Sequence, residues 1–243
     1  APPPSRSCRR SRSVPRPGVR RVTVASLGGR TSVDAADVRV RAESLGRLDL
    51  AVDLRTPTGA PAGIEALLAS ARQAGGAHVR LDAVTEAVLA GVLALRAAHT
   101  SVEAVSDDDE ALRALADPRS GSAVLQRSTH TSARVGTGAI VDLAGGDLAL
   151  TATSRARTEV GGAALTALVG SSDTEASIDT DSAVTGAATL RLDATTRESL
   201  ATRAAVALTS SMARTAATVA AGSPLFTAGD LFLTATLNTT TNA

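Results

Sequence analysis

Residues 148–153, LALTAT, decide the fold, because the chain repeats their pattern. The pattern is an aliphatic residue, any residue, a second aliphatic residue, a polar residue and then alanine. It recurs as VRVRA at 38–42, VRLDA at 79–83, LRLDA at 190–194 and LFLTA at 231–235. Successive copies begin 41, 69, 42 and 41 positions apart. A fixed period of this size indicates an array of supersecondary units.

Aliphatic and polar residues alternate within these repeats, which is the period typical of a β-strand. The alternation is clear in Leu48, Leu50, Val52 and Leu54. A short strand with one apolar face needs a neighbour stacked in register to bury that face. We therefore expect an all-β fold, a right-handed parallel β-helix (β-solenoid), over residues 22–243. If a coil takes roughly 20 to 25 residues, the period of 41 or 42 corresponds to two coils.

The second half of the chain is the most regular part. Residues 133–148, 176–190 and 217–231 each follow the order strand, turn, strand, turn, strand. Gly145, Gly146 and Asp147 mark one of these turns, because glycine allows positive φ and aspartate satisfies turn amides.

Two short helical insertions are expected in the solenoid, near 63–74 and 106–118. Ile64, Leu67, Leu68 and Ala71 have helical spacing, and two glycines follow them. In the second segment Ser106 could cap a helix that begins with acidic residues. An insertion here would also explain the long spacing of 69 residues. The competing interpretation is an alanine-rich helical array that includes 160–169 and 200–219.

Composition favours a narrow, layered core. Hydrophobic residues make up 44% of the 243 residues, yet there are two Phe and no Trp or Tyr. Small aliphatic residues stacked in register fill a solenoid better than a sphere. Cys8 is the single cysteine, which excludes an intrachain disulfide and a zinc quartet of cysteines.

The charge is uneven along the chain. Residues 1–21 contain seven arginines and no acidic residue, whereas the rest has 18 arginines against 24 acidic residues. A basic tail could touch nucleic acid, anionic lipid or acidic glycan. We expect instead that 1–21 is a disordered Pro/Ser/Arg tail and that nucleic acid is not a partner. The longest apolar run, 87–95, is too short for a membrane span.

Residues 133–154, ARVGTGAIVDLAGGDLALTATS, resemble the repeat of very large bacterial surface exoproteins of the haemagglutinin and autotransporter-passenger type. The resemblance covers 131–243 well, and 22–54 and 77–105 loosely. It implies an exported right-handed β-helix with an adhesive or structural role, outside the cell or on its surface. Two features depart from the family: the expected helical insertion near 106–118, and the scarcity of asparagine, which occurs only as Asn238 and Asn242.

The residues that could carry chemistry form no recognisable catalytic motif. His99 and His130 both precede Thr-Ser, so a structural repeat explains them, and His78 has no such context. The acidic run of Asp107, Asp108, Asp109 and Glu110 could bind calcium. It lacks the ligand spacing of a calcium loop, so we expect a solvated helix start.

Two further patterns suggest function. A carboxylate pair for sugar cleavage could come from five aspartates, but with two phenylalanines the chain has no aromatic residues to spare as platforms for sugar rings. These are Asp142, Asp147, Asp179, Asp181 and Asp193. Thr-x-Thr pairs in this chain resemble the threonine rows with which some β-solenoids bind ice. They occur at Thr151–Thr153, Thr234–Thr236 and residues 239–241. The equivalent positions, Arg41 and Glu43, Asp82 and Val84, and Asp193 and Thr195, interrupt the row.

The sequence thus predicts a non-enzymatic structural or adhesive segment of a secreted or cell-surface repeat protein, able to form fibres by end-to-end stacking. The alternatives are a carbohydrate-active β-helix enzyme that uses an aspartate pair, and an ice- or surface-binding solenoid. We expect no catalytic, cofactor-binding or metal-ligating residue. The expected partners are further coils, other copies of the chain, and a glycan or cell-surface ligand. The absence of a cap before Ala243 predicts that more chain, or another subunit, continues the stack.

Overall fold

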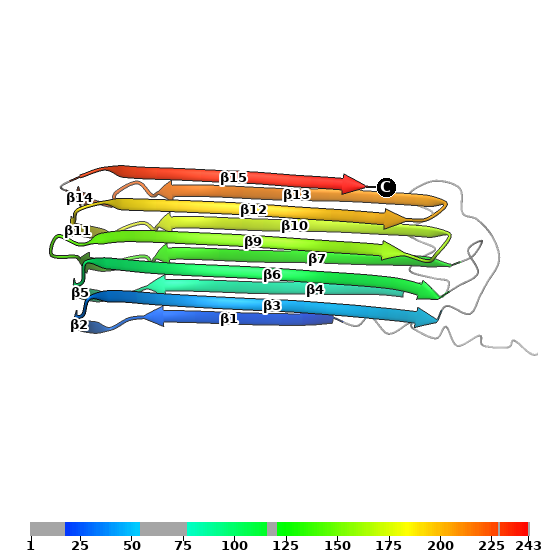
Figure 1. The fold of residues 1–243 in the computed structure, drawn as a ribbon, viewed down its shortest axis with the longest axis horizontal. Coiled ribbons are helices and arrows are strands. Elements are labelled where there is room, and N and C mark those ends of the chain that lie inside the picture. The colour runs from blue at the N-terminus through cyan, green and yellow to red at the C-terminus, as the bar shows by residue number, and fades with distance from the viewer. Residues whose placement is uncertain (1–17, 54–76, 116–120, 228, 243) are drawn as a thin grey trace, which may run out of the picture.

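The computed structural model describes residues 18–53, 77–115, 121–227 and 229–242. Their strands form three parallel five-stranded sheets, here named A, B and C (Figure 1). Sheet A contains β1 (Gly18–Leu27), β4 (Ala77–Leu89), β7 (Ser122–Val135), β10 (Leu165–Ile178) and β13 (Val206–Val219). Sheet B contains β2 (Arg30–Asp34), β5 (Val92–Arg96), β8 (Ile140–Asp142), β11 (Ala183–Ala187) and β14 (Leu225–Thr227). Sheet C contains β3 (Asp37–Asp53), β6 (His99–Leu115), β9 (Asp147–Gly161), β12 (Leu190–Arg203) and β15 (Leu231–Asn242).

The chain passes through sheets A, B and C in that order, five times, and we call each passage a coil. Sheets A and C are two long layers whose strands run in opposite directions, and the short sheet B lies at one end of both (Figure 1). Each inner strand forms backbone hydrogen bonds with the coils on both sides, which satisfies its amide and carbonyl groups. The all-β prediction is confirmed, and the parallel sheets are consistent with a β-solenoid.

Like residues stack on like residues across the coils. One inward column of sheet C consists of alanine throughout: Ala42, Ala104, Ala152, Ala194 and Ala235. Sheet A has a threonine column beside an alanine column. The threonine column is Thr23, Thr85, Thr131, Thr174 and Thr215. Such columns fix the register, because a slip of one residue would turn every inward side chain to the solvent.

The core has two apolar clusters with polar residues between them. The larger cluster lies against sheet B and includes Leu89, Leu95, Val141 and Leu190. The smaller cluster lies toward the opposite ends of sheets A and C and includes Leu112, Leu125, Val160 and Leu200. Buried serine, threonine and charged side chains occupy the positions between these clusters along the strands. This polar layer is the candidate site described below.

The period of 41 residues is one coil, and the two-coil interpretation is wrong. Leu190 in β12 is the direct neighbour of Leu231 in β15, 41 residues later. The copy at 79–83 is also misplaced, since Val79 belongs to β4 in sheet A. The true counterpart of Val38 and Leu148 in the second coil is Thr100, which is buried. A threonine in an aliphatic column hid this copy and produced the apparent spacing of 69.

The helix expected over 106–118 is wrong, because β6 extends through 106–115. Pairing with β3 on one side and β9 on the other overrides the local helix signals. The helical interpretation of 160–169 and 200–219 is also wrong, since strands of sheets A and C occupy these segments apart from short connections. The insertion expected near 63–74 lies outside the described residues. Strand β1 begins at Gly18, so 18–21 belong to the sheet and not to the basic tail.

Candidate functional site

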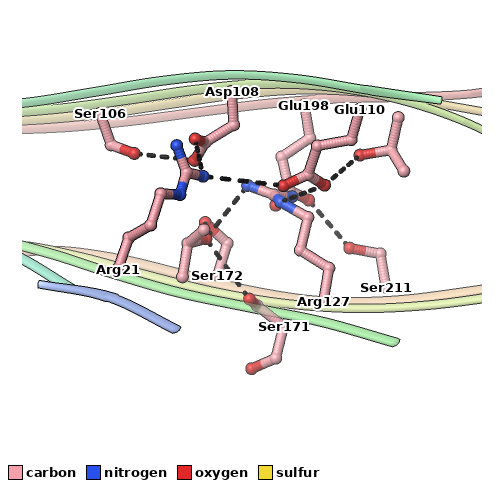
Figure 2. A network of polar contacts seen from close by, with 11 residues as sticks. Arg21, Ser106, Asp108, Glu110, Arg127, Ser171, Ser172, Glu198 and Ser211 are labelled. Atoms are coloured by element: carbon pink, nitrogen blue, oxygen red, sulfur yellow. Dashed lines mark hydrogen bonds and ion pairs between the residues drawn. The ribbon is translucent and has the colours of Figure 1, made fainter. Parts of the chain in front are cut away.

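Charged side chains from both long sheets meet inside the core (Figure 2). Sheet A contributes two arginines, Arg21 from β1 and Arg127 from β7. Sheet C contributes three acids, Asp108 and Glu110 from β6 and Glu198 from β12. We call these five residues the buried network. The strand alternation that turns aliphatic residues inward elsewhere turns these residues inward here.

Arg127 is at the centre of the buried network. Its side chain is 0% exposed, and its Nη1 lies 3.3 Å from Glu198 Oε1. Its Nε lies 3.4 Å from Glu110 Oε2, and its Nη2 donates to the Thr129 hydroxyl at 3.1 Å. A buried guanidinium is tolerated only where opposite charges and acceptors surround it, so these partners are essential to the core.

The acids of the network have further partners. Arg21 forms an ion pair with Asp108, and its Nη2 lies 3.9 Å from Glu110 Oε1. Asp108 accepts a hydrogen bond from the Ser106 hydroxyl at 2.9 Å. Glu198 accepts one from the Ser211 hydroxyl at 2.9 Å. Ser211 belongs to the last coil and Arg21 to the first, so the network and its hydroxyl partners connect all five coils.

Burial raises the pKa of Glu110 from 4.5 to about 7. Arg127 and Arg21 oppose this rise through their positive charges, as does the hydroxyl of Thr158, while Asp108 adds to it. Two arginines face three carboxyl groups in the network. A proton on Glu110 therefore balances the charge inside the core.

Gly46 makes room for Arg21. A Cβ atom at this position of β3 would overlap the Arg21 guanidinium and approach the Asp108 carboxylate. The column that holds Gly46 continues with Asp108, Ala156 and Glu198, so the smallest side chain lies where the arginine crosses. The network is closed to solvent on the acidic side, with Asp108 and Glu198 side chains both 0% exposed. This arrangement favours a role in joining coils.

The acidic run 107–110 does not act as one cluster. Asp108 and Glu110 point inward to the arginines, whereas Asp107 and Asp109 lie on the outer face. The expected solvated helix start is wrong for the two inward residues. Among the described residues, no group of three or more His, Cys, Asp or Glu side chains is placed to hold a metal ion.

The histidines are not structural equivalents of one another. His99 lies in sheet C, with its Nδ1 3.2 Å from Asp147 Oδ2. His130 lies in sheet A, with its Nδ1 3.3 Å from Asp173 Oδ2. The shared His-Thr-Ser context therefore arises in two different sheets, and the interpretation as a structural repeat is wrong. His78 lies in β4.

The five candidate aspartates are dispersed over the coil. Asp179 accepts from Arg134 at 2.9 Å and Asp193 contacts Arg191. Asp142 accepts from the backbone amide of Ala144 at 3.3 Å, and Asp181 has a positive φ of 57° in the turn after β10. Each aspartate has different neighbours, and no hydrogen bond or ion pair brings two of the five together.

The Thr-x-Thr pairs lie on the outer face of sheet C. The first threonine column reads Arg41, Glu103, Thr151, Asp193 and Thr234, and is interrupted. The second contains three consecutive threonines, Thr153, Thr195 and Thr236. The true counterparts in the second coil are Glu103 and Val105, which replace the expected Asp82 and Val84.

No protein-family model, curated protein or solved structure matches the chain. The likeness to repeats of bacterial surface exoproteins therefore stays a prediction from the sequence. In the part of the chain that the structure describes, no helix is long and apolar enough to span a membrane.

Neither arginine of the buried network was predicted from the sequence to lie in the core. Arg21 was assigned to the tail, and Arg127 lies between polar neighbours that resemble any solvated strand. The strand alternation could have identified Arg127 as an inward residue. Arg127 is separated by an even number of positions from Leu125, Thr129 and Thr131 in β7, so it lies on the same face of the strand.

Proposed function

We propose that the chain is a non-enzymatic structural segment of a secreted or cell-surface repeat protein. In this proposal the three sheets close into a right-handed β-solenoid that stacks end to end, and its side faces are available for adhesion.

The observation that carries the proposal is the match between the two ends of the stack. At one end β13 presents Thr215, Ala217 and Val219 in inward columns. At the other end β1 presents Thr23, Ala25 and Leu27 in the same columns. In sheet C, Leu233 and Ala235 of β15 correspond to Val40 and Ala42 of β3. A second copy could therefore continue the columns without a change of register.

The end formed by β15 leaves apolar side chains uncovered. Leu231, Leu233 and Leu237 occupy inward columns, yet they are 45%, 50% and 48% exposed. Their equivalents in β12, Leu190 and Leu192, are fully buried by the next coil. An added coil would bury the β15 leucines and pair the open strand edge, and both effects favour association.

The outer columns are compatible with this stacking. In the continued register Asn238 would meet Leu45 and Thr240 would meet Arg47, while Arg214 would meet Val22. Asp230, just before β15, would meet Asp37 of the next copy, and this exposed like-charge pair is the one unfavourable charge contact of the continued register. The occupant proposed for the open end is therefore a second copy of this chain.

Light scattering across a concentration series tests the proposal. We expect mass to rise with concentration for the wild type, and Leu233→Glu to remain monomeric because a carboxylate would enter the apolar column. Thr240→Glu, a change on the same strand that points outward, should assemble like the wild type. A wild type that stays monomeric at every concentration would overturn the proposal.

A further inference from the structure

Arginine side chains gather on the outer face of sheet C without carboxylate partners. Arg155 in β9 and Arg197 in β12 are direct neighbours in register, and Arg157 lies two residues along β9 on the same face. All three are exposed. Like charges directly opposite each other on paired strands are destabilising, so this placement works against the sheet.

Several other arginines on this face are paired, although within the described part of the chain Arg47 in β3 and Arg113 in β6 are not. Arg191 contacts Asp193, and Arg203 Nε lies 3.4 Å from Glu159 Oε1. In the first coil, Arg39 and Arg41 both contact Glu103. Arg155, Arg157 and Arg197 form no ion pair or side-chain hydrogen bond with any described residue, although Asp107 is the register neighbour of Arg155. Their guanidinium donors are thus free for a ligand.

A surface hollow of about 510 Å³ surrounds these arginines. Its other polar lining residues are Asp107, Glu198, Ser199, Asn238 and Thr240, and the Glu198 carboxylate is turned into the core toward Arg127. A second hollow beside it, of about 300 Å³, combines Arg47, Arg113 and Arg157 with Asp49, Asp109, Glu110 and Glu159. The first hollow therefore has an excess of positive charge that its neighbour lacks.

We infer that Arg155, Arg157 and Arg197 form a binding site for clustered oxyanions of the phosphate-ester or sulfate-ester type. The guanidinium fork matches such groups with paired hydrogen bonds. The backbones of Arg155 and Arg197 lie on adjacent strands, which are about 4.8 Å apart. The two side chains can therefore bind neighbouring oxyanions of one ligand. Ser199, Asn238 and Thr240 add neutral hydrogen-bond donors at the edge.

The surroundings limit the class of ligand. The hollow has no aromatic side chain on which a nucleobase could stack, which disfavours single-stranded nucleic acid. It has no large apolar side chain that could enter a lipid layer. The site lies on a side face, so it does not depend on end-to-end assembly.

Calorimetric titration of the full chain with sucrose octasulfate and with inositol hexakisphosphate tests the site. The probe that binds with the higher affinity shows whether the site prefers sulfate esters or phosphate esters. We expect the double variant R155Q/R197Q to bind either probe about tenfold or more weakly, because two charge-assisted contacts are lost. Arg191→Gln, on the same face and strand as Arg197, should bind within about twofold of the wild type, since exposed charges outside the site contribute little.

Thermal unfolding separates binding from folding. Without a probe, R155Q/R197Q should melt at or above the wild-type temperature, because like-charge repulsion is relieved. At the same concentration, either probe should raise the melting temperature of the wild type more than that of the double variant. Equal affinity of R155Q/R197Q and wild type, or an equal loss in R191Q, would overturn the site. Light scattering on the same samples reports assembly, so failure here is distinct from failure of end-to-end stacking.

Discussion

Glu110 is the member of the buried network whose protonation changes near neutral pH. Its pKa rises from 4.5 to about 7 because it is buried, so the folded chain holds this proton more tightly than the unfolded chain does. Below pH 4.5 both states are protonated and the group imposes no penalty. Between pH 4.5 and 7 the unfolded chain loses the proton first, so the free energy of unfolding falls as pH rises.

We expect Glu110 to lower the free energy of unfolding by about 3 kcal/mol between pH 4.5 and 7, with no further loss above that range. Glu110→Gln removes the titration and keeps the shape of the side chain. Urea unfolding at several pH values should therefore show a difference between wild type and variant that follows this window. Glu159→Gln, on the outer face of the same sheet, should keep the wild-type profile. A wild-type-minus-E110Q difference that is flat from pH 4.5 to 7 would contradict the prediction.

The buried network shows which residue-scale features the sequence could not predict. Arg21 and Asp108 are 87 positions apart, and Arg127 and Glu198 are 71 apart. Each residue alone resembles a solvated charge on a strand or at a helix start. Only the stacking of sheets A and C opposite one another brings them together, and no local pattern carries that information.

At the scale of the element, the turns between sheets set the path of each coil. Gly91, between β4 and β5, has a φ of +81°, and its carbonyl accepts from the Ile140 amide of the next coil at 2.8 Å. The Val92 amide donates to the Gly29 carbonyl at 2.8 Å, so the turn is joined to the coils on both sides. A Cβ atom at Gly91 would collide with the Gly29 carbonyl oxygen.

We expect Gly91→Ala to destabilise the fold more than Gly138→Ala. Gly138 also has a positive φ, +70°, but a Cβ there would meet open space. Its replacement should cost about 1 to 2 kcal/mol for the backbone conformation alone. Gly91→Ala adds the collision with a backbone atom that cannot move without disturbing the neighbouring coil. Urea unfolding of both variants measures the difference, and equal losses would show that the stacked turn is not tightly packed.

The strands were easier to predict than the units they form. Alternation predicted the strands around Val40 and Leu150, and the Gly145 turn, because these depend on neighbouring residues. The coil length and the helix at 106–118 were wrong for a shared reason. Thr100 and Asp108 occupy inward positions that usually hold aliphatic side chains, so the pattern failed where distant partners replaced apolar packing.

At the scale of the whole molecule, the coils differ in how many neighbours they have. Strands β7, β8 and β9 pair on both sides, whereas β1, β2, β3, β13, β14 and β15 pair on one side only. Local opening free energies follow such differences, because an edge strand loses fewer contacts when it opens.

We expect hydrogen exchange to be slowest in β7 and β9 and fastest in β15. Raising the protein concentration should slow exchange in the first and last coils only, since those are the edges that a second copy would cover. Mass spectrometry of peptides from each coil measures this. The Leu233→Glu variant should show no dependence on concentration, and a uniform slowing over all coils would argue against stacking at the ends.

The molecule is shorter along the stacking direction than along its strands (Figure 1). The 15 residues of β9 span about 50 Å at 3.3 Å per residue, whereas five coils rise about 24 Å. The long axis in Figure 1 accordingly runs along the strands. One copy is thus a slab about twice as broad as it is tall, and an assembly becomes longer than it is broad only when a third copy joins, at about 72 Å. In electron micrographs, dimers of this chain should look nearly square, and elongated particles should begin at the trimer.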